Sequence, residues 1–174
     1  LAAVVYNGNI WTSTDSGATW TENTSTGSGK EWNSITSSSD GTKLAASIWS
    51  GNIWTSTDSG ATWTEDTSVG STKGWRSITS SSEFTKLAAV VGNMVGNIWR
   101  AQPTPPPWLQ QQKLTASDAA SNDYFGRSVS VSGDYAVVGA NENDDAGSNS
   151  GSAYIFVRSG TTWTQQQKLT ASDA

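Results

Sequence analysis

The chain has 174 residues and a net charge of −5, and it contains no cysteine and no histidine. The sequence therefore excludes thiol catalysis, disulfides, histidine acid–base chemistry and the common zinc sites. Its ten Lys and Arg residues are scattered, which argues against a nucleic-acid partner, and no apolar run reaches the roughly 18–20 residues of a membrane span.

A repeat of 43 residues forms the first half of the chain, since residues 1–43 and 44–86 are identical at 32 of 43 positions. Such a period, with Trp and Gly at fixed offsets, is typical of stacked β-sheet blades. Turn residues such as Asn7-Gly8 divide each unit into short segments. The first unit predicts strands over 1–6, 10–14, 19–24 and 32–38. No stretch has helical spacing, so we expect an all-β antiparallel meander.

The third unit begins like the others at 87–91 and then breaks into a Pro-rich segment at 103–107. A second repeat follows, in which 108–119 returns almost unchanged as 163–174. Aligning Trp163 with Trp20 makes both repeats versions of one blade. We therefore expect fifteen strands, in a β-propeller or partial propeller of about four blades of four antiparallel strands.

Two interpretations of the Pro-rich segment remain open. It is a hairpin connection within one continuous propeller module, which we favour, or a stiff linker between a unit at 1–107 and a unit at 108–174. The chain begins within a predicted strand at Leu1 and has no initiator Met. We therefore expect it to be a processed product or a piece of a longer chain.

Two family resemblances rest on these motifs. Ser-x-Asp-x-Gly-x-Thr-Trp, at 13–20 and again at 56–63, resembles the Asp-box, or BNR repeat, of sialidase-like and related β-propellers. Residues 108–174 resemble an FG-GAP repeat of the integrin α-chain type, through 124–129, 133–140 and 151–156, although Asn141 stands where that family usually has Pro. Both resemblances imply β-propeller blades, and neither implies one function.

We predict a structural role for the Asp-box. A carboxylate in a hairpin turn accepts backbone N–H bonds, and glycine there allows positive φ. We expect the two tryptophans to pack between sheets. The predicted structural set is Ser13, Asp15, Gly17, Trp20, Ser56, Asp58, Gly60 and Trp63. In the resembling family the box is likewise a fold element; a ligand carboxylate is the less favoured alternative.

The sialidase resemblance implies three arginines that clamp a carboxylate, a Tyr/Glu pair and an acidic Asp. This chain has Arg76, Arg100, Arg127 and Arg158, and Arg76 and Arg127 fall at similar blade positions. No local motif supports catalysis, and the chain is short for a six-bladed enzyme. We therefore predict no catalytic residue, and keep a sialidase-like glycosidase as an unfavoured alternative.

The integrin-type resemblance implies calcium bound in a loop of oxygen ligands. The nearest candidates are Asn141, Asn143, Asp144 and Asp145, whose oxygens suit a hard cation. Their spacing departs from the family loop, so we favour a solvated acidic loop and keep a weak Ca²⁺ site as the alternative, with no other cofactor. Asn23-Thr24-Ser25 is an N-glycosylation sequon, which has meaning only in a secreted eukaryotic protein.

These observations predict a non-enzymatic β-propeller module that binds protein or glycan. We expect it outside the cytoplasm: secreted, at a cell surface in adhesion, or in an organelle lumen or periplasm. The second hypothesis is a structural or accessory subunit held by other chains of a larger assembly, including the photosystem-associated lumenal role that the Asp-box resemblance implies. Fold alone does not establish function.

Overall fold

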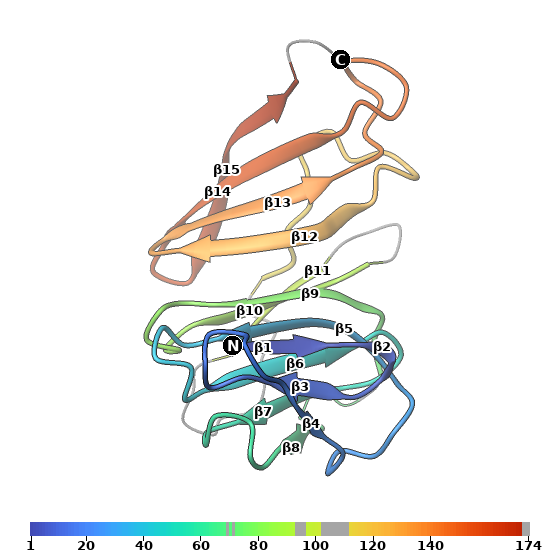
Figure 1. The fold of residues 1–174 in the computed structure, drawn as a ribbon. Helices are drawn as coiled ribbons and strands as arrows, with labels where there is room; N and C mark the ends of the chain where they lie inside the picture. Colours follow the sequence, from blue (N-terminus) through green and yellow to red (C-terminus); the bar gives the residue numbers. More distant parts are fainter. Residues whose placement is uncertain (69, 71, 93–96, 102–111, 172–174) are drawn as a thin grey trace.

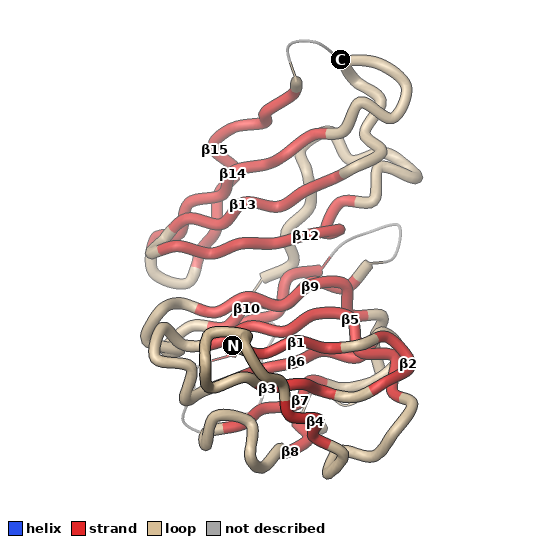
Figure 2. The backbone as a smooth tube through the Cα atoms, viewed as in Figure 1, coloured by secondary structure: helices blue, strands red, loops and turns tan. Residues whose placement is uncertain are grey.

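The structure is a computed structural model, and it describes residues 1–68, 70, 72–92, 97–101 and 112–171. Within these residues the chain forms fifteen strands, β1 to β15, and no helix. The strands are arranged in antiparallel sheets, which Figure 1 shows stacked along the molecule and Figure 2 marks in red. This confirms the predicted all-β class. The described part contains no helix long and apolar enough to cross a membrane.

Two of the sheets contain a four-stranded meander, in which each strand pairs with the next one along the chain. One meander consists of β5 (Lys30–Ser37), β6 (Leu44–Ile48), β7 (Ile53–Ser56) and β8 (Thr64–Asp66). The other consists of β12 (Phe125–Ser132), β13 (Tyr135–Ala140), β14 (Ser152–Ser159) and β15 (Thr162–Thr170). Four antiparallel strands in sequence order are the pattern of a propeller blade.

The other two sheets have three described strands each. The first consists of β1 (Ala2–Val4), β3 (Ile10–Thr12) and β4 (Thr21–Asn23). The second consists of β9 (Trp75–Ser80), β10 (Leu87–Val91) and β11 (Asn97–Ala101). Both follow the same meander, so they are blades with three strands described.

Short bridges fasten neighbouring sheets to each other. The three-residue strand β2 (Tyr6–Gly8) leaves the first sheet and pairs with β5, with Gly8 opposite Lys30. The same bridge recurs 43 residues later, where Gly51 lies opposite Lys73. Because the repeat carries its own link to the next repeat, the same sequence unit can be stacked again and again.

The sheets are offset from the sequence repeat. The last strand of the first repeat, β5, pairs with the first strand of the second repeat, β6, with Ser37 opposite Leu44. A blade therefore runs from the end of one repeat into the next, rather than over residues 1–43 as the sequence grouping implied. A periodic sequence looks the same in every phase, so similarity between units cannot locate the blade boundary.

The central strands β6 and β10 are buried along their whole length, because a sheet packs on each of their faces. This explains their continuous apolar sequence. Ala88 and Val90 of β10 belong to the same buried cluster as Val129, Val138 and Phe156 of the last sheet. The two kinds of repeat thus share one core. The Pro-rich segment 103–107 lies outside the described residues, so its interpretation stays a prediction.

Candidate functional site

The two Asp-box turns are closed by the same set of hydrogen bonds. The carboxylate of Asp15 accepts from Thr19 N at 2.9 Å, Thr19 Oγ1 at 2.6 Å and Ser13 Oγ at 2.8 Å. Ser13 Oγ accepts in turn from Gly17 N at 2.8 Å. The carboxylate is therefore directed into its own turn, where its hydrogen bonds stabilise the local backbone.

The second turn repeats this geometry. Asp58 accepts from Thr62 N, Thr62 Oγ1 and Ser56 Oγ at 2.9, 2.6 and 2.8 Å, and Gly60 N donates to Ser56 Oγ at 2.9 Å. The hydrogen bonds from Thr62 are the largest cause that lowers the pKa of Asp58 to about 2. Thr19 does the same for Asp15. Both carboxylates are thus held ionised.

The two Asp-box tryptophans differ in burial. Trp63 is half-buried against a cluster that includes Trp32 and Ile48, and its Nε1 donates to Gly60 O at 3.0 Å. Trp20 is an exposed residue, so the expectation that it packs between sheets is wrong. The reason is its place in the first sheet, which has a neighbouring sheet on one side only in the described structure.

The sequon residue Asn23 links two sheets. Its Nδ2, the atom to which a glycan would be attached, donates to Gly60 O at 2.7 Å and lies 3.4 Å from Ala61 O. Its Oδ1 accepts from Ser25 N and Oγ. Glycosylation of Asn23 stays a prediction, and the modification would have to displace a contact between the first two sheets.

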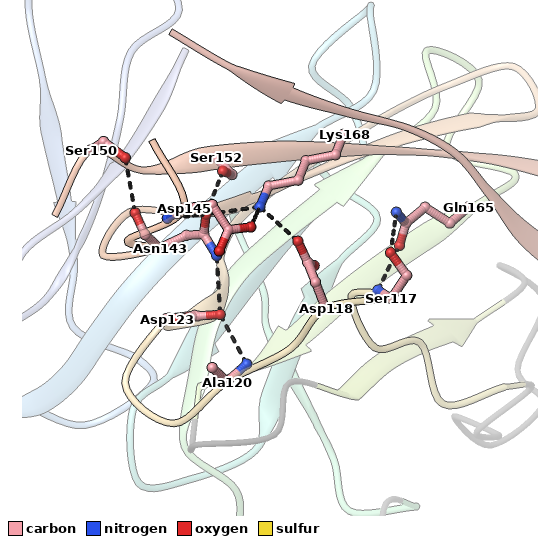
Figure 3. A network of polar contacts seen from close by, with 10 residues as sticks. All are labelled: Ser117, Asp118, Ala120, Asp123, Asn143, Asp145, Ser150, Ser152, Gln165 and Lys168. Carbon is pink, nitrogen blue, oxygen red and sulfur yellow. Dashed lines mark hydrogen bonds and ion pairs between the residues drawn. The ribbon is translucent and has the colours of Figure 1, made fainter. Parts of the chain in front are cut away.

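The acidic loop after β13 is organised around a lysine of β15 (Figure 3). Lys168 Nζ donates to Asn143 Oδ1 at 2.9 Å, to Asp118 Oδ2 at 2.6 Å and to Asp145 Oδ2. Asn143 is buried, and its Nδ2 donates to Asp123 Oδ2 at 3.2 Å. An ammonium group thus lies among the oxygens where the sequence analysis considered a calcium ion.

The four calcium candidates do not all converge. Asn143 and Asp145 contact Lys168, whereas Asp144 accepts from Asn149 N at 2.7 Å and Asn141 donates to Glu142 at 3.4 Å. Among the described residues, no group of three or more His, Cys, Asp or Glu side chains is placed to hold a metal ion. The weak calcium site stays a prediction, and Ca²⁺ would have to compete with Lys168.

Charge pairing and burial set the titration of this network. Burial opposes the charge on Lys168 and Asp118, yet their mutual hydrogen bond, with further bonds from Asp145, raises the pKa of Lys168 and lowers that of Asp118. Burial raises the pKa of the adjacent Tyr154 to about 12. All three groups therefore keep one protonation state near neutral pH, and the network serves as a fixed clamp rather than a proton donor.

Sequence reasoning missed Lys168, Asp118 and Asp123 as partners of the loop. These residues come from segments about 20 or more positions away, and no local spacing connects them to Asn143. One signal was present: Lys168 and Asp118 both belong to the 55-residue repeat, whose other copies are Lys113 and Asp173. A lysine that recurs in the repeat can pair with the carboxylates of an acidic loop, so this pattern predicts an ion pair as readily as a metal site.

One family-model match agrees with this architecture. Residues 108–156 match the model of the FG-GAP repeat family, which together with the stacked antiparallel meanders identifies a β-propeller repeat protein. The GH74 enzyme of Niastella koreensis is a similar solved structure, with a TM-score of 0.43 and 14% identity over 94% of this chain. The chain spans 29% of the length of that enzyme chain. No curated protein matches the sequence.

Proposed function

We propose that this chain is a non-enzymatic β-propeller interaction module that binds protein through the outer faces of its first and last sheets. One observation carries the proposal. The pentapeptide Leu-Ala-Ala-Val-Val occurs at residues 1–5 and again at residues 87–91, and the two copies differ in burial.

The second copy lies in the interior. Leu87 is 3% exposed and Val91 is 5% exposed, because β10 is covered on both faces. In the first copy, Leu1 is 69% exposed and Val5 is 48% exposed. The same apolar sequence is therefore buried where a neighbouring sheet exists and open to water where none is described. Surface of this kind, when contiguous, marks an interaction site.

The last sheet has a matching open face. Along β13, Ala136, Val138 and Ala140 are buried, while Tyr135 and Val137 on the other face are exposed. Val137 lies opposite Ile155 and Tyr135 lies opposite Val157 on β14, so these apolar side chains share the open face.

The exposed apolar side chains gather at the two ends of the stack. All eight large hydrophobic residues that are exposed in the described structure fall within residues 1–20 or 124–169. Only Tyr6 of these eight belongs to a strand of an inner sheet, since β2 pairs with β5. This distribution is expected of a stack whose two end faces are binding surfaces.

The partner that fits these faces is another sheet of the same kind. Within the chain, the face of β10 that is equivalent to the open surface is covered by a neighbouring sheet. The first Leu-Ala-Ala-Val-Val copy has the same sequence, so a similar sheet from another chain can cover it in the same way. In a second copy, the first sheet would dock on the last sheet of its neighbour. Such head-to-tail contacts are heterologous and generate rings or filaments.

Size-exclusion chromatography with light scattering tests this proposal. We expect the mass to rise above that of one chain with concentration, and Val137→Lys to reduce the association. Thr64→Lys, at an exposed position of β8 in the second sheet, is the matched control for a charge added away from the two end faces. A single-chain mass at every concentration, with wild type and Val137→Lys alike, would overturn the proposal.

A structural subunit of a larger assembly is the second candidate, because the same open faces would also serve different neighbouring chains. A location outside the cytoplasm belongs to the proposal as well. It is supported by the polar, Thr- and Trp-rich β composition, and fractionation of the producing cells tests it.

The non-enzymatic part of the proposal is supported by the state of the carboxylates. Glycoside hydrolysis needs one protonated and one ionised carboxyl group at a set separation. Asp15, Asp40 and Asp58 each have a pKa lowered to about 2 by hydrogen bonds within their own turns, so none is suited to act as the acid. Turnover of a fluorogenic sialoside by the purified chain would contradict this part.

A further inference from the structure

Three positions at which the first two repeats differ meet in space. In the first repeat, Tyr6 donates from its hydroxyl to Glu31 at 3.1 Å. In the second repeat these positions are Trp49 and Gly74, and Asn33 is replaced by Arg76. A hydrogen-bonded pair that includes a carboxylate has thus been exchanged for an aromatic ring, a glycine and a cation.

The replaced residues form a stacked pair. The guanidinium carbon of Arg76 lies 3.7 Å from the centroid of the Trp49 ring, and a Cβ at position 74 would meet that ring at 3.5 Å. Stacking on an indole fixes the plane of the guanidinium and leaves its N–H edge available for hydrogen bonds.

The third repeat makes room for this arginine. Gly92 stands where the first two repeats have Tyr6 and Trp49, and a Cβ at Gly92 would overlap Cγ of Arg76. Gly92 N donates to Gly74 O at 2.9 Å, which holds the two glycine segments together. Arg76 therefore lies between the Trp49 ring and the backbone of Gly92.

A second arginine lies on the neighbouring blade. Arg127 of β12 occupies the position that corresponds to Arg76 of β9, and these two strands are in contact where the inner sheets meet the last sheet (Figure 1). Burial, and then the charge of Arg127, lower the pKa of Arg76. Two cations thus lie near each other.

Neither cation has an acidic partner in the described structure. The ion pairs of the described structure join Lys86 and Arg158 to Asp134, and Lys168 to Asp118 and Asp145. None of them includes Arg76 or Arg127. Two neighbouring guanidinium groups without a counter-charge repel each other. An anion between them would remove that repulsion and gain charge-assisted hydrogen bonds.

We propose that Arg76 and Arg127 form a binding site for an oxyanion, a carboxylate or phosphate group, with Trp49 and Gly92 holding Arg76 in place. Arg76 supplies a fixed fork of N–H donors, and Arg127, which is exposed, supplies the second charge. The site lies apart from the open end faces and does not depend on the protein-binding proposal.

Titration monitored by NMR tests this inference, with the arginine Nε–H signals as the readout. Inorganic phosphate and acetate are the two probes, and sodium chloride at equal ionic strength is the reference. We expect saturable shifts of the Arg76 and Arg127 signals with at least one probe. Saturation with phosphate alone assigns a phosphate group, and saturation with acetate assigns a carboxylate; both support the site.

Variants taken from the repeat itself supply the controls. Arg76→Asn restores the residue of the first repeat, and we expect it to weaken binding at least tenfold, as should Arg127→Gln. Gly92→Ala keeps every charge but displaces Arg76, so it should also weaken binding. Arg158→Gln, which removes a cation already paired with Asp134, should leave binding unchanged.

Two results would overturn the site. One is the absence of a saturable shift beyond that caused by chloride. The other is equal affinity in wild type, Arg76→Asn and Arg127→Gln. Circular dichroism of each variant confirms that it is folded, and if Gly92→Ala unfolds the chain, the two arginine variants still decide the question.

Discussion

The first and second Asp-box turns share one sequence, and their matching hydrogen bonds agree in length to within 0.1 Å, but their surroundings differ. A Cβ at Gly17 would approach Leu1 Cδ1 at 3.4 Å, whereas a Cβ at Gly60 would lie 2.8 Å from Thr12 Cγ2 and 3.1 Å from Leu44 Cδ1. The turn itself follows from local sequence. Its burial depends on whether another sheet is stacked against it. Comparing the two turns therefore distinguishes stabilisation by hydrogen bonds within the turn from stabilisation by packing between sheets.

The largest effect should come from the matched leucines. Leu87→Ala shortens a side chain that is buried in β10, a strand covered on both faces. We expect it to cost about 2–5 kcal/mol of unfolding free energy. Leu1→Ala changes the same residue of the same pentapeptide, and should stay within about 0.5 kcal/mol. Urea unfolding of both variants measures the difference. Equal losses would mean that Leu1 is covered in solution, by a second copy or otherwise.

The glycines of the Asp-box should show the next effect. Gly17 and Gly60 have φ values of 94° and 89°, so alanine is strained at both by about 1–2 kcal/mol. Gly60→Ala also drives a methyl group into Thr12 and Leu44, which adds about 1–3 kcal/mol. Thermal unfolding of the two variants compares them. If Gly17→Ala is the more harmful change, the first two sheets are not packed as described.

The sequence predicted this local level well. The Asn-Gly and Asp-Ser-Gly turns and the apolar runs of β6 and β10 all depend on residues within a few positions of one another. The blade phase was not predictable, because β5 follows β4 and precedes β6 along the chain, and the 43-residue period is the same whichever of the two it pairs with.

Long-range side-chain partners were likewise beyond the sequence pattern. Asn143 and Asp145 have the oxygen ligands of a cation loop, and the sequence located the loop correctly. It could not show that the cation is Lys168, which arrives from β15 through the register that places Lys168 opposite Tyr154. Similarly, Arg76 and Trp49 each differ from the residue at the same position of the first repeat, but their contact depends on the stacking of two strands.

Two equivalent lysines of the 55-residue repeat, Lys168 and Lys113, test the contribution of the acidic loop to stability. Lys168→Gln removes the ammonium group shared by Asn143, Asp118 and Asp145, and should cost about 1–2 kcal/mol because the charged hydrogen bonds are lost while the acids keep partial access to water. Lys113→Gln changes the equivalent residue of the other 55-residue copy, which has no ion pair in the described structure, and should be nearly neutral.

Calcium sharpens the comparison between these two lysines. We expect Ca²⁺ to raise the melting temperature of Lys168→Gln more than that of wild type, because the ion no longer competes with an ammonium group. Calorimetry with and without Ca²⁺ measures this. A rise of equal size in wild type and both variants would place any calcium elsewhere.

The smallest difference should be between the two Asp-box carboxylates, since their turns are the same. Hydrogen bonds lower the pKa of Asp15 and of Asp58 from 3.8 to about 2 in the folded chain. A lowered folded-state pKa means that the stabilisation is present above roughly pH 4 and is lost as the pH falls towards about 2. Asp15→Asn and Asp58→Asn should each remove part of this acid-induced loss, and by similar amounts, in melting temperatures recorded from roughly pH 2 to 6. A much larger effect for Asp58→Asn would show that the hydrogen bonds common to both turns are not the main cause of the lowered pKa of Asp58.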